Sequence, residues 1–254
     1  MAVLAEHDSA TAARILAAAR ELILKRGVKG LTVAEIAEKA HVGKGTAYLY
    51  WGTKQDLLFE LFARDFLTFL EGEIQALDAD PEAGMPQRLC PRVARNALNY
   101  PIVRAMQTGD DDRLGAFGQH PRSVELLGRL GPATVVHSVL PVWREYRLVR
   151  TDWPLDEQAY ALQALMTGFL GAATRPPTPT SVTVDDPDKV MAAAVTALLR
   201  PEEAGPEGVG PAELRTVAEE GLRLLRERRD AMLALIATYP GTKHSQEPER
   251  SGSS

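Results

Sequence analysis

Hydrogen-bond donors gather in one short stretch of this 254-residue chain. Lysine and hydroxyl side chains crowd into eleven residues, among them Lys44, Thr46, Tyr48, Tyr50 and Lys54. Ammonium and hydroxyl donors at this density suit the phosphate oxygens of a nucleic acid, and such contacts position a protein on the duplex. Gly45 leaves the backbone bare among them, so this stretch can approach a base edge closely. The pattern predicts a nucleic-acid contact near the N-terminus.

Two short helices around a tight turn must position these side chains. Apolar residues within 33–40 recur at helical spacing, and Thr32 with Glu35 forms the pattern of an N-terminal capping box. A turn beside Gly43 precedes a second helix that runs to about Trp51. This is the layout of a helix-turn-helix, whose second helix enters the major groove of DNA. An ordinary pair of short helices in a bundle is the alternative, and periodicity alone does not separate the two.

The same stretch resembles the TetR family of bacterial transcriptional regulators. The resemblance is carried by LTVAEIA at 31–37, VGKGT at 42–46 and YLYWGTK at 48–54, and the motif spans residues 15–61. It implies that one set of side chains holds DNA phosphates, namely Thr32, Tyr48, Tyr50 and Lys54. It also implies a set that faces the bases, namely Lys44, Gly45, Thr46 and Leu49.

The chain departs from the family pattern at positions that affect this contact. Gly43 replaces the usual serine, so a capping hydroxyl that often touches phosphate is missing; glycine in its place weakens the helix start by only a few tenths of a kcal/mol. Leu49 replaces a frequent tyrosine and can make only apolar contact, for instance with a thymine methyl group. Tyr50 and Trp51 replace a frequent His-Phe pair. We expect the base preference to differ from that of relatives.

A nucleotide-binding or catalytic function has little support. Gly43-Lys44-Gly45-Thr46 looks like the end of a phosphate-binding loop, but that loop needs another glycine five residues earlier and a preceding strand. Glu38 occupies that position, inside a predicted helix. The chain has no H-E-x-x-H, no G-x-S-x-G and no Cys/His pair at metal spacing. We expect no enzymatic activity, no cofactor and no metal.

Helical periodicity dominates the rest of the chain and predicts an all-α fold. A first helix should end at Gly27, and Thr53 should cap a long helix over 54–77 that connects the N-terminal helices to the larger, C-terminal part. We expect a DNA-binding domain over 1–53, a helical domain over 54–240 and a disordered tail over 241–254. Further helices are expected over 86–99, 101–108, 121–149, 155–174, 188–199 and 212–239.

The resemblance implies that the larger domain holds a small-molecule pocket and a dimer interface. The pocket candidates are aromatic, Met and His residues at helical spacing, namely Phe62, Phe66, Met106, Phe117, His137, Trp143, Tyr146, Met166 and Phe169. Plain core packing is the alternative for each, and Trp143 and Tyr146 are favoured because they bring a polar group to an apolar stretch. The interface candidates are small residues that permit close helix approach, namely Gly168, Gly171 and Ala172; internal packing is equally compatible with them.

Charge distribution and cysteine content indicate where DNA would bind and in which compartment the protein works. The net charge is −5, yet residues 1–60 carry eight Lys/Arg against seven Asp/Glu, so any DNA contact belongs at the N-terminus. Cys90 is the only cysteine and reads as a packing residue in a reducing compartment. We see no signal peptide and no apolar run near the roughly 20 residues of a membrane span. A cytoplasmic protein that does not contact membranes is predicted.

These features lead to one main functional hypothesis. We expect a homodimeric TetR-like repressor that binds a palindromic double-stranded DNA operator and is released by a small-molecule effector of unknown identity. Two copies are needed because one short helix reads only a few base pairs. One alternative is a helical small-molecule-binding or catalytic protein whose head no longer binds DNA. Another is an interaction scaffold that uses the helix over 212–239, which could also extend the dimer interface, lie over the pocket or cover the core.

Overall fold

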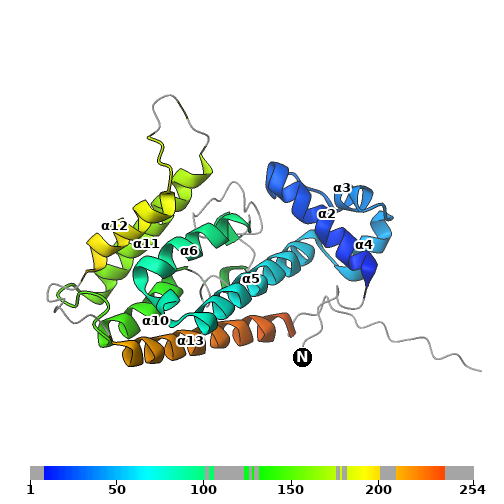
Figure 1. Cartoon of the computed structure of the whole chain (residues 1–254). Coiled ribbons are helices and arrows are strands. Elements are labelled where there is room, and N and C mark those ends of the chain that lie inside the picture. Colours follow the sequence, from blue (N-terminus) through cyan, green and yellow to red (C-terminus); the bar gives the residue numbers. More distant parts are fainter. Residues whose placement is uncertain are drawn as a thin grey trace, which may run out of the picture.

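The computed structural model describes residues 9–100, 103–105, 123–125, 128, 132–175, 178, 182–200 and 210–237. Their regular elements are α-helices and one short 3-10 helix, so the predicted all-α fold is confirmed for this part of the chain. Figure 1 shows a small group of helices, α2, α3 and α4, at one end of the molecule and a larger group at the other. Helix α5 runs between the two groups.

The N-terminal group, called the head below, consists of α2 (Ala10–Arg26), α3 (Val33–Lys39) and α4 (Lys44–Tyr50). Helix α2 begins where the Ser9 hydroxyl accepts a hydrogen bond from a first-turn amide. It ends as predicted at Gly27, whose φ of 77° favours glycine because a Cβ is disfavoured there.

The turn between α3 and α4 is made by His41, and Gly43 lies beside it, as the sequence predicted. His41 adopts a left-handed φ of 54°, whereas Gly43 has an ordinary φ of −67°. The turn is closed by the Val42 amide, which donates to the carbonyl of Ala37 at 2.9 Å. Left-handed backbone is uncommon outside glycine, although histidine is among the residues that tolerate it. Gly43 therefore serves as the N-cap of α4 and not as the turning residue.

Helix α5 (Lys54–Ala79) links the head to the rest of the chain. It starts at the predicted capping box, in which the Thr53 hydroxyl accepts from the Asp56 amide at 3.1 Å and the Asp56 carboxylate accepts from the Thr53 amide at 2.9 Å. It continues two residues beyond the predicted end at Leu77. Its 26 residues span about 39 Å at 1.5 Å per residue, enough to reach from the head along the larger helical group.

The larger group, called the body below, places its remaining elements around α5. Helices α6 and α12 pack together, α11 packs on α10, α12 and α6, and α13 lies along α5, next to the 3-10 helix η1 and α10 (Figure 1). The predicted bounds agree within about two residues for α6, α11, α12 and the start of α13. The elements are η1 (Pro81–Gly84), α6 (Pro86–Leu98), α10 (Pro132–Glu145), α11 (Leu155–Thr174), α12 (Pro187–Leu199) and α13 (Pro211–Ala237).

Helix α10 ends before the predicted residue. The helix expected to reach residue 149 ends at Glu145, because Arg147 takes a left-handed φ of 56°. The amide of Leu148 then turns back to donate to the carbonyl of Trp143 at 2.8 Å, which satisfies a carbonyl at the helix end. Most of the helix expected over 101–108, and the tail over 241–254, lie outside the described residues.

Helix α13 packs on the end of α5 through glycine. The Leu77 side chain fits between Gly84 and Gly221: a Cβ added at Gly221 would lie 2.8 Å from Leu77 Cδ2, and one at Gly84 would lie 3.1 Å from Leu77 Cδ1. Leu77 belongs to a small buried cluster with Ile74, Ala83, Ala218 and Leu222. Of the roles left open for the helix over 212–239, these contacts support core packing against α5, and the same helix also lines the cavity described below.

Two further features concern burial. Cys90 on α6 is 4% exposed, as expected of a packing residue, and burial raises the pKa of its thiol to about 12. Among the described helices, none combines the length and the apolar character that a membrane crossing requires.

Candidate nucleic-acid interface and internal cavity

Helix α4 presents one face to the protein and the other to solvent. Ala47 is 1% exposed and Trp51, its C-cap, is 2% exposed, so this side packs into the head. Leu49 is 79% exposed and Tyr48 is 43% exposed on the other side. A leucine that projects this far from a small domain gains nothing from folding. The exposed face of α4 is therefore free to contact another molecule.

Two glycines, Gly43 and Gly45, leave the backbone exposed at the start of α4. Gly43 provides no side-chain cap, as its replacement of serine predicted. A Cβ added at Gly45 would meet no atom within 4 Å, so the fold does not require glycine there. Lys44 and Gly45 are exposed and Thr46 is half-buried. The predicted base-facing residues thus include three well-exposed positions, Lys44, Gly45 and Leu49.

Tyr48 differs from the other residues of the predicted phosphate set. Lys44 Nζ lies 5.8 Å from the centroid of the Tyr48 ring, so a cation rests over an exposed aromatic face. No described residue hydrogen-bonds the Tyr48 hydroxyl. This hydroxyl remains available to an external acceptor.

Thr32, Tyr50 and Lys54 already have partners within the head. The Thr32 hydroxyl donates to Glu35 Oε2 at 2.8 Å as part of the capping box. The Tyr50 hydroxyl lies 2.6 Å from Ser9 Oγ. Lys54 Nζ donates to the carbonyl of Val28 at 3.3 Å, and burial lowers the pKa of Lys54. Any phosphate bound by these three groups must share them with, or take them from, the contacts that hold the head together.

Glu35 places a negative charge beside Thr32. Its carboxylate accepts from the Arg26 guanidinium at 2.7 Å, and this bond, with those from Thr32, lowers the pKa of Glu35 to about 2. It stays ionised at neutral pH. Of the predicted phosphate contacts, Thr32 therefore has the least favourable electrostatic surroundings.

A buried polar clamp joins the head to α5. The indole N–H of Trp51 donates to Glu60 Oε2 at 2.6 Å, and Arg64 Nη2 donates to Glu60 Oε1 at 2.7 Å. Glu60 is 5% exposed. A second ion pair joins Arg20 of α2 to the buried carboxylate of Asp65. Sequence reasoning missed these residues, although three charges inside the apolar run LLFELFARDFLTFL were a visible signal.

A partly open cavity of about 170 Å³ lies in the body. Its wall is mostly apolar and is built from α5, α6, α10, α11 and α13. Four of the predicted pocket residues line it, namely Phe62, Phe66, Trp143 and Met166. The rings of Phe62 and Phe66 are stacked with centroids 5.7 Å apart. The body therefore contains space that an apolar molecule could fill.

Three predicted pocket residues do not line this cavity. The wall of α10 comes from Val135, Val136, Val139, Val142 and Trp143, a helical stripe that leaves His137 on the opposite side. His137 is exposed, and its Nε2 lies 3.2 Å from Asp156 Oδ1. Tyr146 and Phe169 are half-buried against the core but away from the cavity wall. Met106 and Phe117 lie outside the described residues.

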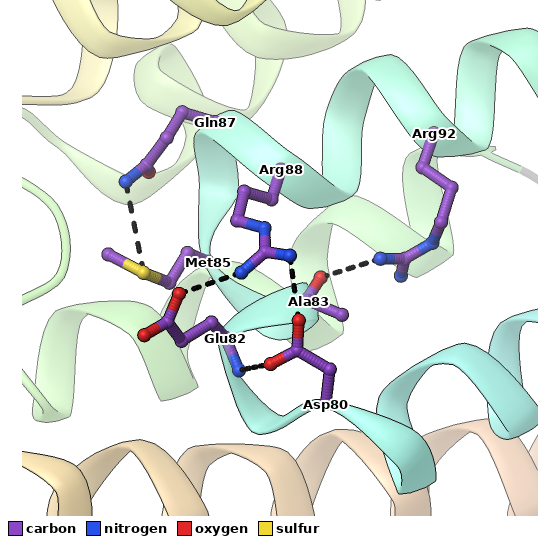
Figure 2. A network of polar contacts seen from close by, with 7 residues as sticks. All are labelled: Asp80, Glu82, Ala83, Met85, Gln87, Arg88 and Arg92. Atoms are coloured by element: carbon purple, nitrogen blue, oxygen red, sulfur yellow. Dashed lines mark hydrogen bonds and ion pairs between the residues drawn. The ribbon is translucent and has the colours of Figure 1, made fainter.

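Trp143 uses its polar group to hold the wall together. Its indole N–H donates to the carbonyl of Gly84 at 3.0 Å, so it is not directed at a ligand. Gly84 ends the 3-10 helix η1, which Figure 2 shows tied to α6 by two arginines. Arg88 pairs with Asp80 and Glu82, both at 2.7 Å, and Arg92 Nη1 donates to the carbonyl of Ala83 at 2.9 Å. This network fixes one edge of the cavity.

Two charged residues also line the cavity, and sequence reasoning did not select either. Glu73 of α5 accepts from Arg92 Nε at 3.0 Å and from Asn96 Nδ2 at 2.6 Å. Arg228 of α13 donates through Nη2 to the carbonyl of Thr134 and to Ser138 Oγ, both at 3.0 Å. Each is under 10% exposed.

The outer side of α11 carries the predicted interface residues. Tyr160, Ala164, Gly168 and Ala172 recur every four residues and are exposed, Tyr160 by 78%. A Cβ at Gly168 or at Gly171 would meet no atom within 4 Å. Internal packing therefore does not explain these glycines in the described part of the chain.

Comparison with known proteins agrees with the geometry of the head. The family model of bacterial regulatory proteins, tetR family, matches residues 15–61. Residues 15–61 therefore form a TetR-family domain. The TetR-family match covers α2 beyond its first turn, α3, α4 and the start of α5, which together carry the exposed face of α4 and the residues beneath it.

Two curated relatives from Bacillus subtilis (strain 168) match over a similar length. An uncharacterized HTH-type transcriptional regulator, YdeS, is 40% identical over 56 residues, which are 22% of this chain and 28% of that protein. The fatty acid metabolism regulator protein is 40% identical over 58 residues, which are 23% and 30% of the two chains. The matched stretch thus spans less than a third of either relative.

One solved structure aligns over most of the chain. The crystal structure of RolR in complex with the ligand resorcinol covers 82% of this chain and 92% of its own, at 24% identity and a TM-score of 0.43.

Proposed function

We propose that this TetR-family protein is a DNA-binding transcriptional regulator, acting as a cytoplasmic homodimeric repressor that a small molecule releases from a palindromic operator. The observation that carries the proposal is the exposed face of α4, where Leu49 and Tyr48 project beside the bare backbone of Gly45. A short helix of this kind inserts into the major groove and reads base edges. No enzymatic activity is part of the proposal.

Helix α5 offers a physical link between the cavity and the DNA contact. Its residues Phe62 and Phe66 line the cavity, while Glu60 on the same helix is bonded to Trp51 at the end of α4. A ligand that shifts α5 would move the head through this clamp. DNA affinity would then fall by the difference in ligand binding between the two conformations. We propose residue 53 as the boundary of the head, with α5 as the connector.

Dimerisation is proposed through the outer side of α11, together with α12. Replacing Gly168 with glutamate would place a charge in the middle of the small-residue stripe, and burial of an unpaired charge between two copies is strongly unfavourable. We expect the wild type to sediment as a dimer and Gly168→Glu as a monomer in analytical ultracentrifugation. Glu71→Gln on α5, an exposed position away from the stripe, is the control and should remain dimeric. A dimeric Gly168→Glu variant would place the interface elsewhere.

DNA binding is tested with the double variant Tyr48→Ala/Lys54→Ala. Hydrogen bonds to a charged group contribute about 1.5–3 kcal/mol, so we expect affinity for the DNA upstream of its own gene to fall at least about tenfold. The slope of log affinity against log salt should decrease by about 1, because one lysine no longer displaces a counterion. Fluorescence anisotropy at several salt concentrations measures both quantities.

The control removes one positive charge far from the head. Arg223→Ala on α13, whose side chain is 53% exposed, should leave affinity and salt slope unchanged. Because Lys54 also bonds Val28, the unfolding temperature of the double variant must be measured alongside. A folded double variant with wild-type affinity and slope would disprove the assigned phosphate contacts. Absence of specific binding by the wild type would disprove the proposed function.

A further inference from the structure

We propose that the cavity in the body binds a small, mostly apolar anion, and that Arg228 holds its negative group. The ligand class that fits best is a carboxylate on a single aromatic ring. This proposal deepens the proposed function, because such an anion would be the effector, but ligand binding itself can be measured without DNA.

Arg228 is buried, and no carboxylate in the described part of the chain is paired with it. It is 8% exposed, and its contacts with Thr134 and Ser138 are to neutral oxygens. Glu227, the next residue along α13, pairs with Arg223 at 2.6 Å, with its side chain 59% exposed. Among the described residues, no carboxylate forms an ion pair with Arg228. Burying a guanidinium without a counter-charge is unfavourable, and a bound anion would offset this cost.

The other charge on the wall is already neutralised. Glu73 forms an ion pair with Arg92 and accepts a further hydrogen bond from Asn96. Burial lowers the pKa of Arg228, yet an arginine remains charged at neutral pH. Among the described residues that line the cavity, the uncompensated charge is therefore positive and comes from Arg228 of α13. A neutral or cationic ligand would leave it unpaired.

The size and the lining of the cavity indicate the apolar part of the ligand. The volume of about 170 Å³ is close to that of an engineered protein cavity of about 150 Å³ that binds benzene. Phe62, Phe66 and Trp143 line the space with aromatic surface, which favours offset or edge-on packing with another ring. Gln163 of α11 adds an amide to the wall. One ring with one acidic group matches both the volume and the charge.

Benzoate and its neutral analogue benzamide are the probes for this proposal. We expect calorimetry on the full-length protein to show that benzoate binds at least about tenfold more tightly than benzamide, because charge-assisted hydrogen bonds are the stronger ones. Arg228→Met keeps much of the side-chain volume but removes the charge, and should abolish the preference while leaving benzamide affinity within about twofold. Arg228→Lys should retain part of the preference.

Arg226→Met is the matched control, since this arginine lies on the same helix but has a side chain that is 50% exposed. Its Nη2 makes a long contact of 3.9 Å with Asp78 Oδ1. It should keep the wild-type preference. If the wild type binds both probes equally, or binds neither, the proposal is wrong whatever the variants do. It is also wrong if Arg228→Met folds and still prefers benzoate.

DNA binding separates this proposal from the proposed function. A protein that binds benzoate selectively but never binds DNA would support the anion site and disprove the regulator. A protein that binds DNA but not benzoate would support the regulator and disprove the anion site.

Discussion

Replacing Glu60 with alanine should destabilise the protein by about 3–5 kcal/mol, the usual effect of removing one partner from a buried ion pair. Glu60 accepts from Trp51 at 2.6 Å and from Arg64 at 2.7 Å, and both donors are under 10% exposed. Without the carboxylate, Arg64 loses this counter-charge and the indole N–H loses its acceptor. Urea unfolding followed by circular dichroism measures the change in the free energy of unfolding.

Glu71→Ala is the matched control for this prediction. Glu71 lies on the same helix but is exposed, so its loss should change stability by no more than about 0.5 kcal/mol. Glu60→Gln keeps an acceptor for Trp51 but not the charge, and should fall between the two. If Glu60→Ala were as mild as Glu71→Ala, the clamp would contribute little to the attachment of the head.

Gly221→Ala should destabilise the protein even though alanine is the better helix former. The added Cβ would lie 2.8 Å from Leu77 Cδ2, and forcing extra volume into a packed contact typically costs about 1–3 kcal/mol. The gain in helix propensity is about 1 kcal/mol. We therefore expect a net loss in the free energy of unfolding and a shift of α13 away from α5. Urea unfolding tests the first, and the volume of the cavity in a crystal structure tests the second.

Gly72→Ala, on the other helix of this pair, should change the free energy of unfolding in the opposite direction. Gly72 lies within α5, is exposed, and a Cβ there would meet no atom within 4 Å, so the substitution should stabilise by up to about 1 kcal/mol. Combining Gly221→Ala with Leu77→Ala should cost less than the sum of the two single changes, because the smaller side chain vacates the space. Stabilisation by Gly221→Ala alone would contradict the described contact.

Local features of the fold were predictable because short-range chemistry determines them. The capping boxes at Thr32 and Thr53, the helix end at Gly27 and the bounds of α11 each depend on a few neighbouring residues. The end of α10 was missed because Arg147 takes a left-handed conformation that its residue type does not signal. His41 at the α3–α4 turn is a similar case.

Contacts between distant elements were the part that the sequence did not reveal. The family resemblance suggested Phe62, Phe66, Trp143 and Met166 as pocket residues, and all four line the cavity. It could not place His137 on the outside, because the choice between two faces of α10 depends on where α11 and α13 pack.

Sequence reasoning did not select Arg228, because α13 is rich in charged residues and such residues are usually solvated. Its burial follows from the position of that helix against α10. The roles of the DNA, pocket and interface residues stay predictions.

The buried thiol of Cys90 makes this chain a convenient object for distance measurement. Its high pKa and 4% exposure keep the sole native sulfhydryl unreactive toward maleimides and spin labels at neutral pH. A cysteine introduced at Leu24, which is 55% exposed on α2, would then be the single point of attachment in each chain. In the proposed dimer, paired spin labels would report the separation of the two heads in solution, in the native background.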